Sequence, residues 1–290
     1  MLPAKVRTAV RKVAGDGVSV QGVKRLSGGT INQSFHVSLD SGKELFIKHT
    51  SADASCPGMF EAEAAALALI ATSDALRVPD TLYADENCLV QALFQEGRRA
   101  QDWHEQIGRG LAKLHRRVQA QEFGFERDNY LGTSPQSNRS CDSWLDFWRE
   151  RRLEPQIARL HRMLDHDDAL LQTLSRLSAR LDIYLAAWAE PPVFIHGDLW
   201  SGNTTADEKG SPIVFDPAAY FASREAEFGM MRLFGGFGPR TEAAYAEIWP
   251  FESGFETRVE IYRLYHIVNH LIIFGRSYYA EALAVAKSLV

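Results

Sequence analysis

The sequence HGDLWSGN, residues 196–203, directly follows the apolar run PPVFI. A second apolar run, which begins at Pro212, closes on Asp216. A strand that delivers His-x-Asp, an Asn shortly after that Asp, and an Asp at the end of the next strand form the catalytic half of protein-kinase-like sites. In that pattern Asp198 accepts the proton of the attacking hydroxyl, while Asn203 and Asp216 bind the Mg²⁺ ions that bridge the phosphates. These residues predict phosphoryl transfer.

Two departures from the protein-kinase pattern favour a small-molecule kinase. Gly197 stands where protein kinases have Arg, and Pro217 and Ala218 stand where they have Phe and Gly. The longer strings resemble the fructosamine-kinase (ketosamine-3-kinase) family over nearly the whole chain: HGDLWSGN, FDPAAY, REAEFGMMRLFGGF, LYHIVNHLIIFG and, upstream, FGFERDNYLGTSPQSN and WLDFWRERRLEPQ. Trp200 and the LFGGF segment carry this resemblance more specifically than the residues shared with other kinases.

The composition limits the size of the core and the kinds of partner and site that the chain can have. With 290 residues, of which 46% are apolar and 11% aromatic, the chain can bury a large core in one large domain or two lobes. The net charge of −5 and the scattered basic residues give no electrostatic footprint for nucleic acid. Three cysteines, Cys56, Cys88 and Cys141, show no C-x-x-C spacing. Neither a disulfide framework nor a zinc site is therefore expected.

The N-terminal residues 1–15 alternate basic and apolar side chains. They contain no uninterrupted run of the ~7 to 15 apolar residues that a signal peptide requires, so a short amphipathic helix on the surface of the protein is predicted. No segment approaches the ~20 apolar residues of a membrane span. We expect a cytoplasmic protein without a membrane partner.

The first region is predicted to be β-structure, with strands over 18–26, 33–39 and 43–49 and a tight turn at 40–42. Gly28 and Gly29 lie between the first two strands. A glycine pair lets the backbone approach a phosphate and offer its N–H groups, as the glycine-rich loop of kinases does. A simple hairpin turn would also account for the pair, because the three-glycine spacing of that loop is missing.

Lys48 ends the third predicted strand, where kinases place the lysine that holds the α- and β-phosphates. The alanine- and leucine-rich run 59–71 predicts a helix, and Glu63 in its first turns is the expected partner of Lys48. The family's F-x-x-E pattern selects Glu63 over Glu61. Two further strands are predicted within 77–94, and the backbone of Gln91, Ala92 and Leu93 is the expected hinge that bonds the adenine edge.

The predicted fold is α+β, a two-lobed protein-kinase-like fold with a small N-terminal antiparallel sheet, one helix, and a larger, mainly helical C-terminal lobe. Residues 1–93 form the expected ATP-binding lobe, and residues 94–290 form the catalytic and acceptor-binding lobe. Trp144, Trp148 and His115 are interpreted as core residues. His266 and His270 share a helix face, but no carboxylate completes a zinc site.

The resemblance implies an ATP- and Mg²⁺-dependent kinase. Its acceptor would be the 3-hydroxyl of a ketosamine, either a small molecule or a sugar adduct on a glycated protein. In that family the 3-phosphate makes the adduct unstable, so that the free amine is restored in a deglycation repair. Trp200 would face this acceptor, because an aromatic face suits the C–H side of a sugar ring. A packing role beneath the catalytic loop is the alternative for Trp200.

Two other functions fit parts of the pattern. A small-molecule kinase of the aminoglycoside or choline type shares the His-Gly-Asp and Asn residues. Because aminoglycosides are polycations, an acceptor pocket lined with acidic residues would favour that function, whereas Trp200 favours a ketosamine. A nucleotide-binding pseudokinase is disfavoured, because every residue type that phosphoryl transfer needs is present.

Overall fold

The computed structural model describes residues 2–26, 32–50 and 56–290. The first elements are α1 (Ala4–Ala14), β1 (Val20–Leu26), β2 (Gln33–Leu39), β3 (Glu44–His49), α2 (Met59–Thr72), β4 (Thr81–Ala84) and β5 (Cys88–Ala92). Next come α3 (Trp103–Arg117), β6 (Asn129–Leu131), β7 (Ser134–Gln136), α4 (Trp144–Trp148), a π-helical turn (Arg149–Leu153), α5 (Glu154–Leu160), α6 (Ala169–Ala179) and α7 (Asp182–Leu185). The chain ends with β8 (Val193–Ile195), a 3₁₀ turn (Ser201–Asn203), β9 (Thr204–Ala206), β10 (Pro212–Val214), β11 (Tyr220–Ala222), α8 (Ala226–Leu233), α9 (Pro239–Ala246), α10 (Phe255–Phe274), a 3₁₀ turn (Arg276–Tyr278) and α11 (Tyr279–Ser288).

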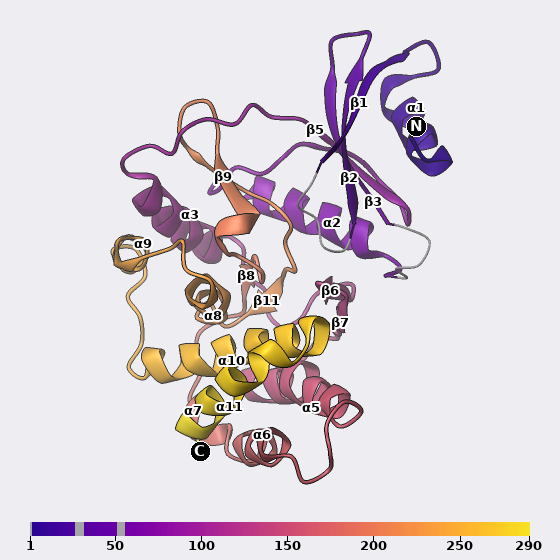
Figure 1. The fold of residues 1–290 in the computed structure, drawn as a ribbon. Helices are drawn as coiled ribbons and strands as arrows, with labels where there is room; N and C mark the ends of the chain where they lie inside the picture. Colours follow the sequence, from indigo (N-terminus) through magenta and orange to yellow (C-terminus); the bar gives the residue numbers. More distant parts are fainter. Residues whose placement is uncertain (1, 27–31, 51–55) are drawn as a thin grey trace.

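Five antiparallel strands form the N-terminal sheet in the order β1-β2-β3-β5-β4 (Figure 1). Because side chains alternate along a strand, Val37 and Ile47 point to one face, where Val6 and Val10 of α1 cover them. Lys48 follows Ile47 and therefore points to the opposite face, towards α2. The sheet and the amphipathic N-terminal helix predicted from the sequence are confirmed.

Helix α2 joins the small sheet to the larger part of the molecule. Ala66 and Ile70 of α2 belong to the same hydrophobic core as Ile107 and Leu111 of α3. Its long alanine- and leucine-rich run has no internal Gly or Pro, so the helix forms continuously over its 14 residues. The lobe boundary near residue 93 remains a prediction, because one face of α2 is buried in the C-terminal core.

The remaining helices enclose one large core. Figure 1 shows α10 and α11 together at the end of the molecule away from the sheet, with α8 lying between them and α3 in this view. Trp144, Trp148 and His115 are fully buried, as predicted. Helix α10 is the long buried helix expected from the apolar periodicity. No helix in the parts of the chain described above is long and apolar enough to cross a membrane.

Candidate active site

The catalytic loop, residues 196–203, begins directly after β8. Hydrogen bonds of the neutral His196 side chain hold this loop in place. Burial lowers the pKa of His196, and its Nδ1 atom accepts the Asp198 N–H at 3.3 Å. The other ring nitrogen, Nε2, therefore carries the proton and donates to the Phe215 carbonyl at 3.0 Å. The Phe215 N–H in turn donates to the Asn203 carbonyl at 3.0 Å. The loop and the residue before Asp216 are thus held in one arrangement.

Glycine at position 197 is required by a close backbone approach. Gly197 has a φ of +78°, and a Cβ atom there would lie 2.3 Å from the Ala218 carbonyl oxygen. The Ala218 N–H also donates to the His196 carbonyl at 3.0 Å. An arginine at this position, as in protein kinases, would force these two segments apart.

Asp198, Asn203 and Asp216 line one cleft. The Asn203 side-chain amide donates to the Asp198 carboxylate at 3.0 Å and to the Asp198 carbonyl at 2.8 Å. Burial and the nearby Asp216 carboxylate raise the pKa of Asp198. Asp216 has a positive φ of 59°, which is uncommon for a residue other than glycine and is typical of functional sites.

Lys48 lies between two carboxylates. Its Nζ atom is 2.6 Å from Glu63 Oε1 and also contacts Asp216. Burial opposes the lysine charge, but Asp216 and Glu63 outweigh it and raise the pKa of Lys48. Burial raises the pKa of Glu63, and the Lys48 ammonium offsets only part of this rise. The ion pair expected between Lys48 and Glu63 is present and connects β3 with α2, while the contact of Lys48 with Asp216 connects β3 with the segment that follows β10.

The cleft has a volume of about 250 Å³ and two chemically different sides. Lys48, Glu63 and the catalytic carboxylates form the charged side. The other side is formed by uncharged residues of the β6–β7 hairpin, α8 and α10, which are Asn129, Tyr130, Leu131, Gly132, Met230, Asn269, His270, Ile273 and Phe274. Trp200 also lines the cleft, and its ring makes an edge contact with Phe234 at a centroid distance of 5.6 Å.

The structure describes only some of the backbone segments that were expected to bind the nucleotide. Gly28 and Gly29 lie outside the described residues. In the sheet, the Ala92 N–H donates to the Asp80 carbonyl at 2.9 Å, and the Leu93 N–H donates to the Glu44 carbonyl at 3.0 Å. These two donors are engaged in the sheet and are not free to bond an adenine ring. Gln91 is buried and does not line the cleft.

Glu227 on α8 is a residue that the sequence interpretation did not assign. It is completely buried, and its two carboxylate oxygens accept the N–H groups of His196 at 2.6 Å and Gly197 at 3.1 Å. Charge-assisted hydrogen bonds of this kind are stronger than neutral ones. Glu227 therefore fixes the backbone from which Asp198 projects. The only sequence signal was a carboxylate within the apolar run AEFGMM.

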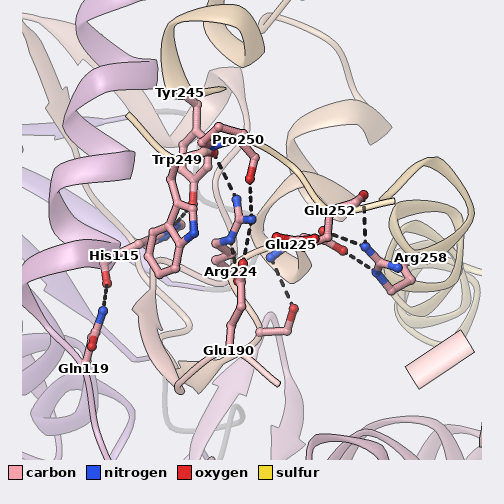
Figure 2. Close-up of polar contacts among 11 residues, drawn as sticks. His115, Gln119, Glu190, Arg224, Glu225, Tyr245, Trp249, Pro250, Glu252 and Arg258 are labelled. Atoms are coloured by element: carbon pink, nitrogen blue, oxygen red, sulfur yellow. Dashed lines mark hydrogen bonds and ion pairs between the residues drawn. The ribbon is translucent and has the colours of Figure 1, made fainter. Parts of the chain in front are cut away.

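Buried ion pairs hold the start of α8 in place. Figure 2 shows Arg224 between Glu190 and the carbonyl groups that follow α9, with distances of 2.6 and 2.9 Å to the Glu190 carboxylate. The next residue, Glu225, pairs with Arg258 of α10 at 2.6 and 2.9 Å. These contacts fix the helix that presents Glu227 to the catalytic loop.

Replacing Glu227 with Gln is expected to lower kcat by about 10-fold to 100-fold, the scale that follows from small misplacements of catalytic groups. A glutamine offers one acceptor oxygen to two backbone donors, so one of the N–H groups of His196 and Gly197 loses its partner. Steady-state kinetics should show the loss in kcat, with KM for the nucleotide nearly unchanged.

Glu225→Gln is the matched control for that variant. Glu225 is equally buried and also lies at the start of α8, but it bonds Arg258 rather than the catalytic loop. It should lower the melting temperature and leave kcat of the folded enzyme near the wild-type value. Equal losses of kcat in the two variants would contradict a specific role of Glu227 in the loop.

The family model described as fructosamine kinase matches residues 2–290. The chain belongs to the fructosamine kinase family. A Synechocystis protein named "Probable ketoamine kinase" is 33% identical over 98% of this chain and 97% of its own length. A chloroplastic protein-ribulosamine 3-kinase of Arabidopsis thaliana is 32% identical over 93% of this chain and 83% of its own length. The family assignment makes this chain a phosphotransferase.

Solved structures agree with this assignment. A crystal structure of a Thermobifida fusca protein described as a "putative fructosamine-3-kinase" superposes with a TM-score of 0.87, at 29% identity over 98% of both chains. The aminoglycoside phosphotransferase APH(4)-Ia, in a complex with AMP-PNP and hygromycin B, has a TM-score of 0.65 at 16% identity, over 99% of this chain and 98% of its own. This more distant similarity shows the two-lobed kinase-like fold, as predicted from the sequence.

The residues of the cleft fit a magnesium ion that is completed by phosphate ligands. Mg²⁺ is usually held by one or two carboxylates together with waters and substrate phosphates. The Asn203 amide and the Asp216 carboxylate offer oxygen atoms of this kind in the cleft. Within residues 2–26, 32–50 and 56–290, no three His, Cys, Asp or Glu residues form a closed metal cage.

Proposed function

We propose that this enzyme transfers the γ-phosphoryl group of ATP to the 3-hydroxyl of a ketosamine. The single observation that carries the proposal is the cleft in which Asp198, Asn203, Asp216 and the Lys48–Glu63 pair meet an uncharged wall that contains Trp200. The ketoamine and ribulosamine kinases among the relatives support a ketosamine acceptor. The 3-phosphate would then promote loss of the sugar and restore the amine, which is a deglycation.

The cleft residues divide the work of phosphoryl transfer. Asp198 orients the acceptor hydroxyl and takes its proton as the bond from oxygen to phosphorus forms and the bond to the ADP oxygen breaks. Asn203 and Asp216 would hold Mg²⁺, which neutralises charge on the phosphates. Lys48, held by Glu63, positions the phosphates, and Gly28 and Gly29, which lie outside the described residues, stay the predicted phosphate-covering loop. The adenine edge would use carbonyl groups of residues 91–93 or N–H groups beyond Leu93.

The chemistry of the acceptor wall favours a ketosamine over an aminoglycoside. A polycationic acceptor calls for carboxylates around it, as stated above. The lining contributed by the β6–β7 hairpin, α8 and α10 instead presents Tyr130, Leu131, Met230, Ile273 and Phe274, with no acidic residue among its described members. The carboxylates that line the cleft are Asp198 and Asp216, which take part in phosphoryl transfer, and Glu63, which pairs with Lys48.

A substrate panel tests the proposal. ADP formation should be measured with fructosamines and ribulosamines, with kanamycin and hygromycin B as aminoglycosides, and with choline. Turnover of at least one ketosamine with a kcat/KM well above that of the other acceptors is expected. Efficient turnover of an aminoglycoside or choline, with every ketosamine ignored, would overturn the acceptor and leave the phosphotransferase assignment intact.

Replacing Trp200 with Ala tests its contact with the acceptor. The change should raise KM for a ketosamine by a factor that corresponds to roughly 1 to 3 kcal/mol, the size of an aromatic stacking contact. KM for ATP should change little, because Trp200 lies on the acceptor side of Asp198. Preserved acceptor kinetics together with a lower melting temperature would instead support packing beneath the loop.

A further inference from the structure

Two phenylalanines, one lining the cleft and one in contact with a residue that lines it, are unusually exposed. Phe234 directly follows α8 and is 40% exposed, and Phe274, the last residue of α10, is 48% exposed. They are the most exposed of the Phe, Tyr and Trp side chains in the described part of the chain. Grouped exposed apolar side chains mark binding surfaces, whereas isolated ones are common on any protein.

Ring contacts connect both phenylalanines to the catalytic loop. Phe234 contacts Trp200 at a centroid distance of 5.6 Å and His270 at 4.8 Å. His270 contacts Phe274 at 5.4 Å. Trp200, His270 and Phe274 also line the cleft itself, so the surface is continuous with the site of phosphoryl transfer. We call Phe234, His270 and Phe274 the aromatic rim.

The rim is an uncharged surface. Burial lowers the pKa of His270 and outweighs the opposite effect of the hydrogen bond that Nδ1 donates to the His266 carbonyl at 2.7 Å, so the ring is neutral near pH 7. Met230 and Ile273 continue the apolar lining from the rim into the cleft. The phosphates belong to the opposite, charged side, with Lys48. An acceptor group that reaches the rim is therefore in contact with apolar carbon rather than with charge.

We propose that the aromatic rim binds the substituent on the ketosamine nitrogen and selects an apolar alkyl chain there. This inference rests on the proposed function. With the sugar's 3-hydroxyl at Asp198, the nitrogen on C1 is two carbons away, and its substituent leaves the cleft through the mouth. Phe274 lines the cleft and is also half exposed, so it lies where the cleft meets solvent, and Phe234 is connected to it through the His270 ring. The alkyl chain would cover the exposed faces of both rings.

A homologous series of acceptors tests the rim. Fructosamines of methylamine, propylamine and hexylamine carry the same sugar and the same charge and differ only in alkyl length. In the wild-type enzyme kcat/KM should rise about tenfold from the methyl to the hexyl adduct. An enclosed pocket can reach this factor with a single methylene group. The rise per methylene is expected to be smaller here because the rim is open to solvent. Phe234→Ala and Phe274→Ala should each reduce this rise, and the double variant should abolish it.

Ile183→Ala is the matched control. Ile183 is 61% exposed on α7 and does not line the cleft, so removing this apolar side chain should preserve the full rise. A rise that persists in the Phe234/Phe274 double variant would overturn the inference. So would equal kcat/KM values across the series in a wild-type enzyme that phosphorylates the methylamine adduct, although the proposed function would then stand. Failure to phosphorylate any ketosamine would remove the proposed function and, with it, this inference.

Discussion

Replacing Asp198 with Asn is expected to lower kcat by about 10² to 10⁴-fold, the usual contribution of a positioned general base. An asparagine keeps the shape of the side chain and can still accept the hydrogen bond from Asn203, so the loop should retain its geometry. It cannot take the proton of the acceptor hydroxyl. Steady-state assays with a ketosamine should show the loss in kcat, and calorimetry with a non-hydrolysable ATP analogue should show nearly unchanged binding.

Asp207→Asn provides the control for that loss. Asp207 lies in the turn between β9 and β10, where it accepts the N–H groups of Lys209 at 2.9 Å and Ser211 at 2.8 Å, and it does not line the catalytic cleft. The same chemical change there should leave kcat near the wild-type value. Near-normal turnover of the Asp198→Asn enzyme would remove Asp198 from the role of base.

The sequence predicted the parts of the site that follow from strand ends. Asp198 comes three residues after one apolar run, Asp216 comes directly after the next, and Lys48 lies at the end of a strand, so the kinase pattern could be recognised from the sequence. Local periodicity also predicted the sheet, α1 and α2, because each element buries one face. Glu63 was selected over Glu61 by a family pattern, and the structure places its carboxylate against Lys48.

Contacts between distant segments could not be predicted in this way. Glu227 bonds the backbone of residues that precede it by about thirty positions, and nothing in its local sequence specifies that partner. The engagement of the Ala92 and Leu93 N–H groups depends on the register of β5 against its neighbours. The aromatic rim likewise brings the end of α8 beside the end of α10. Such contacts arise from tertiary packing, which a strand or helix pattern does not encode.

The contact of Lys48 with Asp216 adds a constraint that the sequence did not reveal. Lys48 is held by two carboxylates, of which Glu63 is buried and Asp216 is partly exposed. Removing Glu63 therefore leaves Lys48 with a partner, whereas removing Lys48 leaves two neighbouring carboxylates without a cation. The two single variants should consequently differ in severity.

Lys48→Met is expected to lower kcat/KM for ATP by about 10²-fold or more, the scale seen when one preorganised electrostatic contact to the reacting group is lost. It should also reduce the free energy of unfolding by up to about 3 to 5 kcal/mol, because a buried charge loses its partner. Glu63→Ala should reduce kcat/KM for ATP less, since Lys48 keeps its charge and its contact with Asp216.

The double variant Lys48→Met/Glu63→Gln separates catalysis from stability. It removes the buried carboxylate charge together with the ammonium, so thermal unfolding should recover much of the stability that Lys48→Met loses. Its kcat/KM for ATP should stay as low as that of Lys48→Met, because no cation reaches the phosphates. If the double variant regained activity along with stability, Lys48 would be a structural residue. If both single variants kept wild-type kcat/KM for ATP, the ion pair would have no part in positioning the nucleotide.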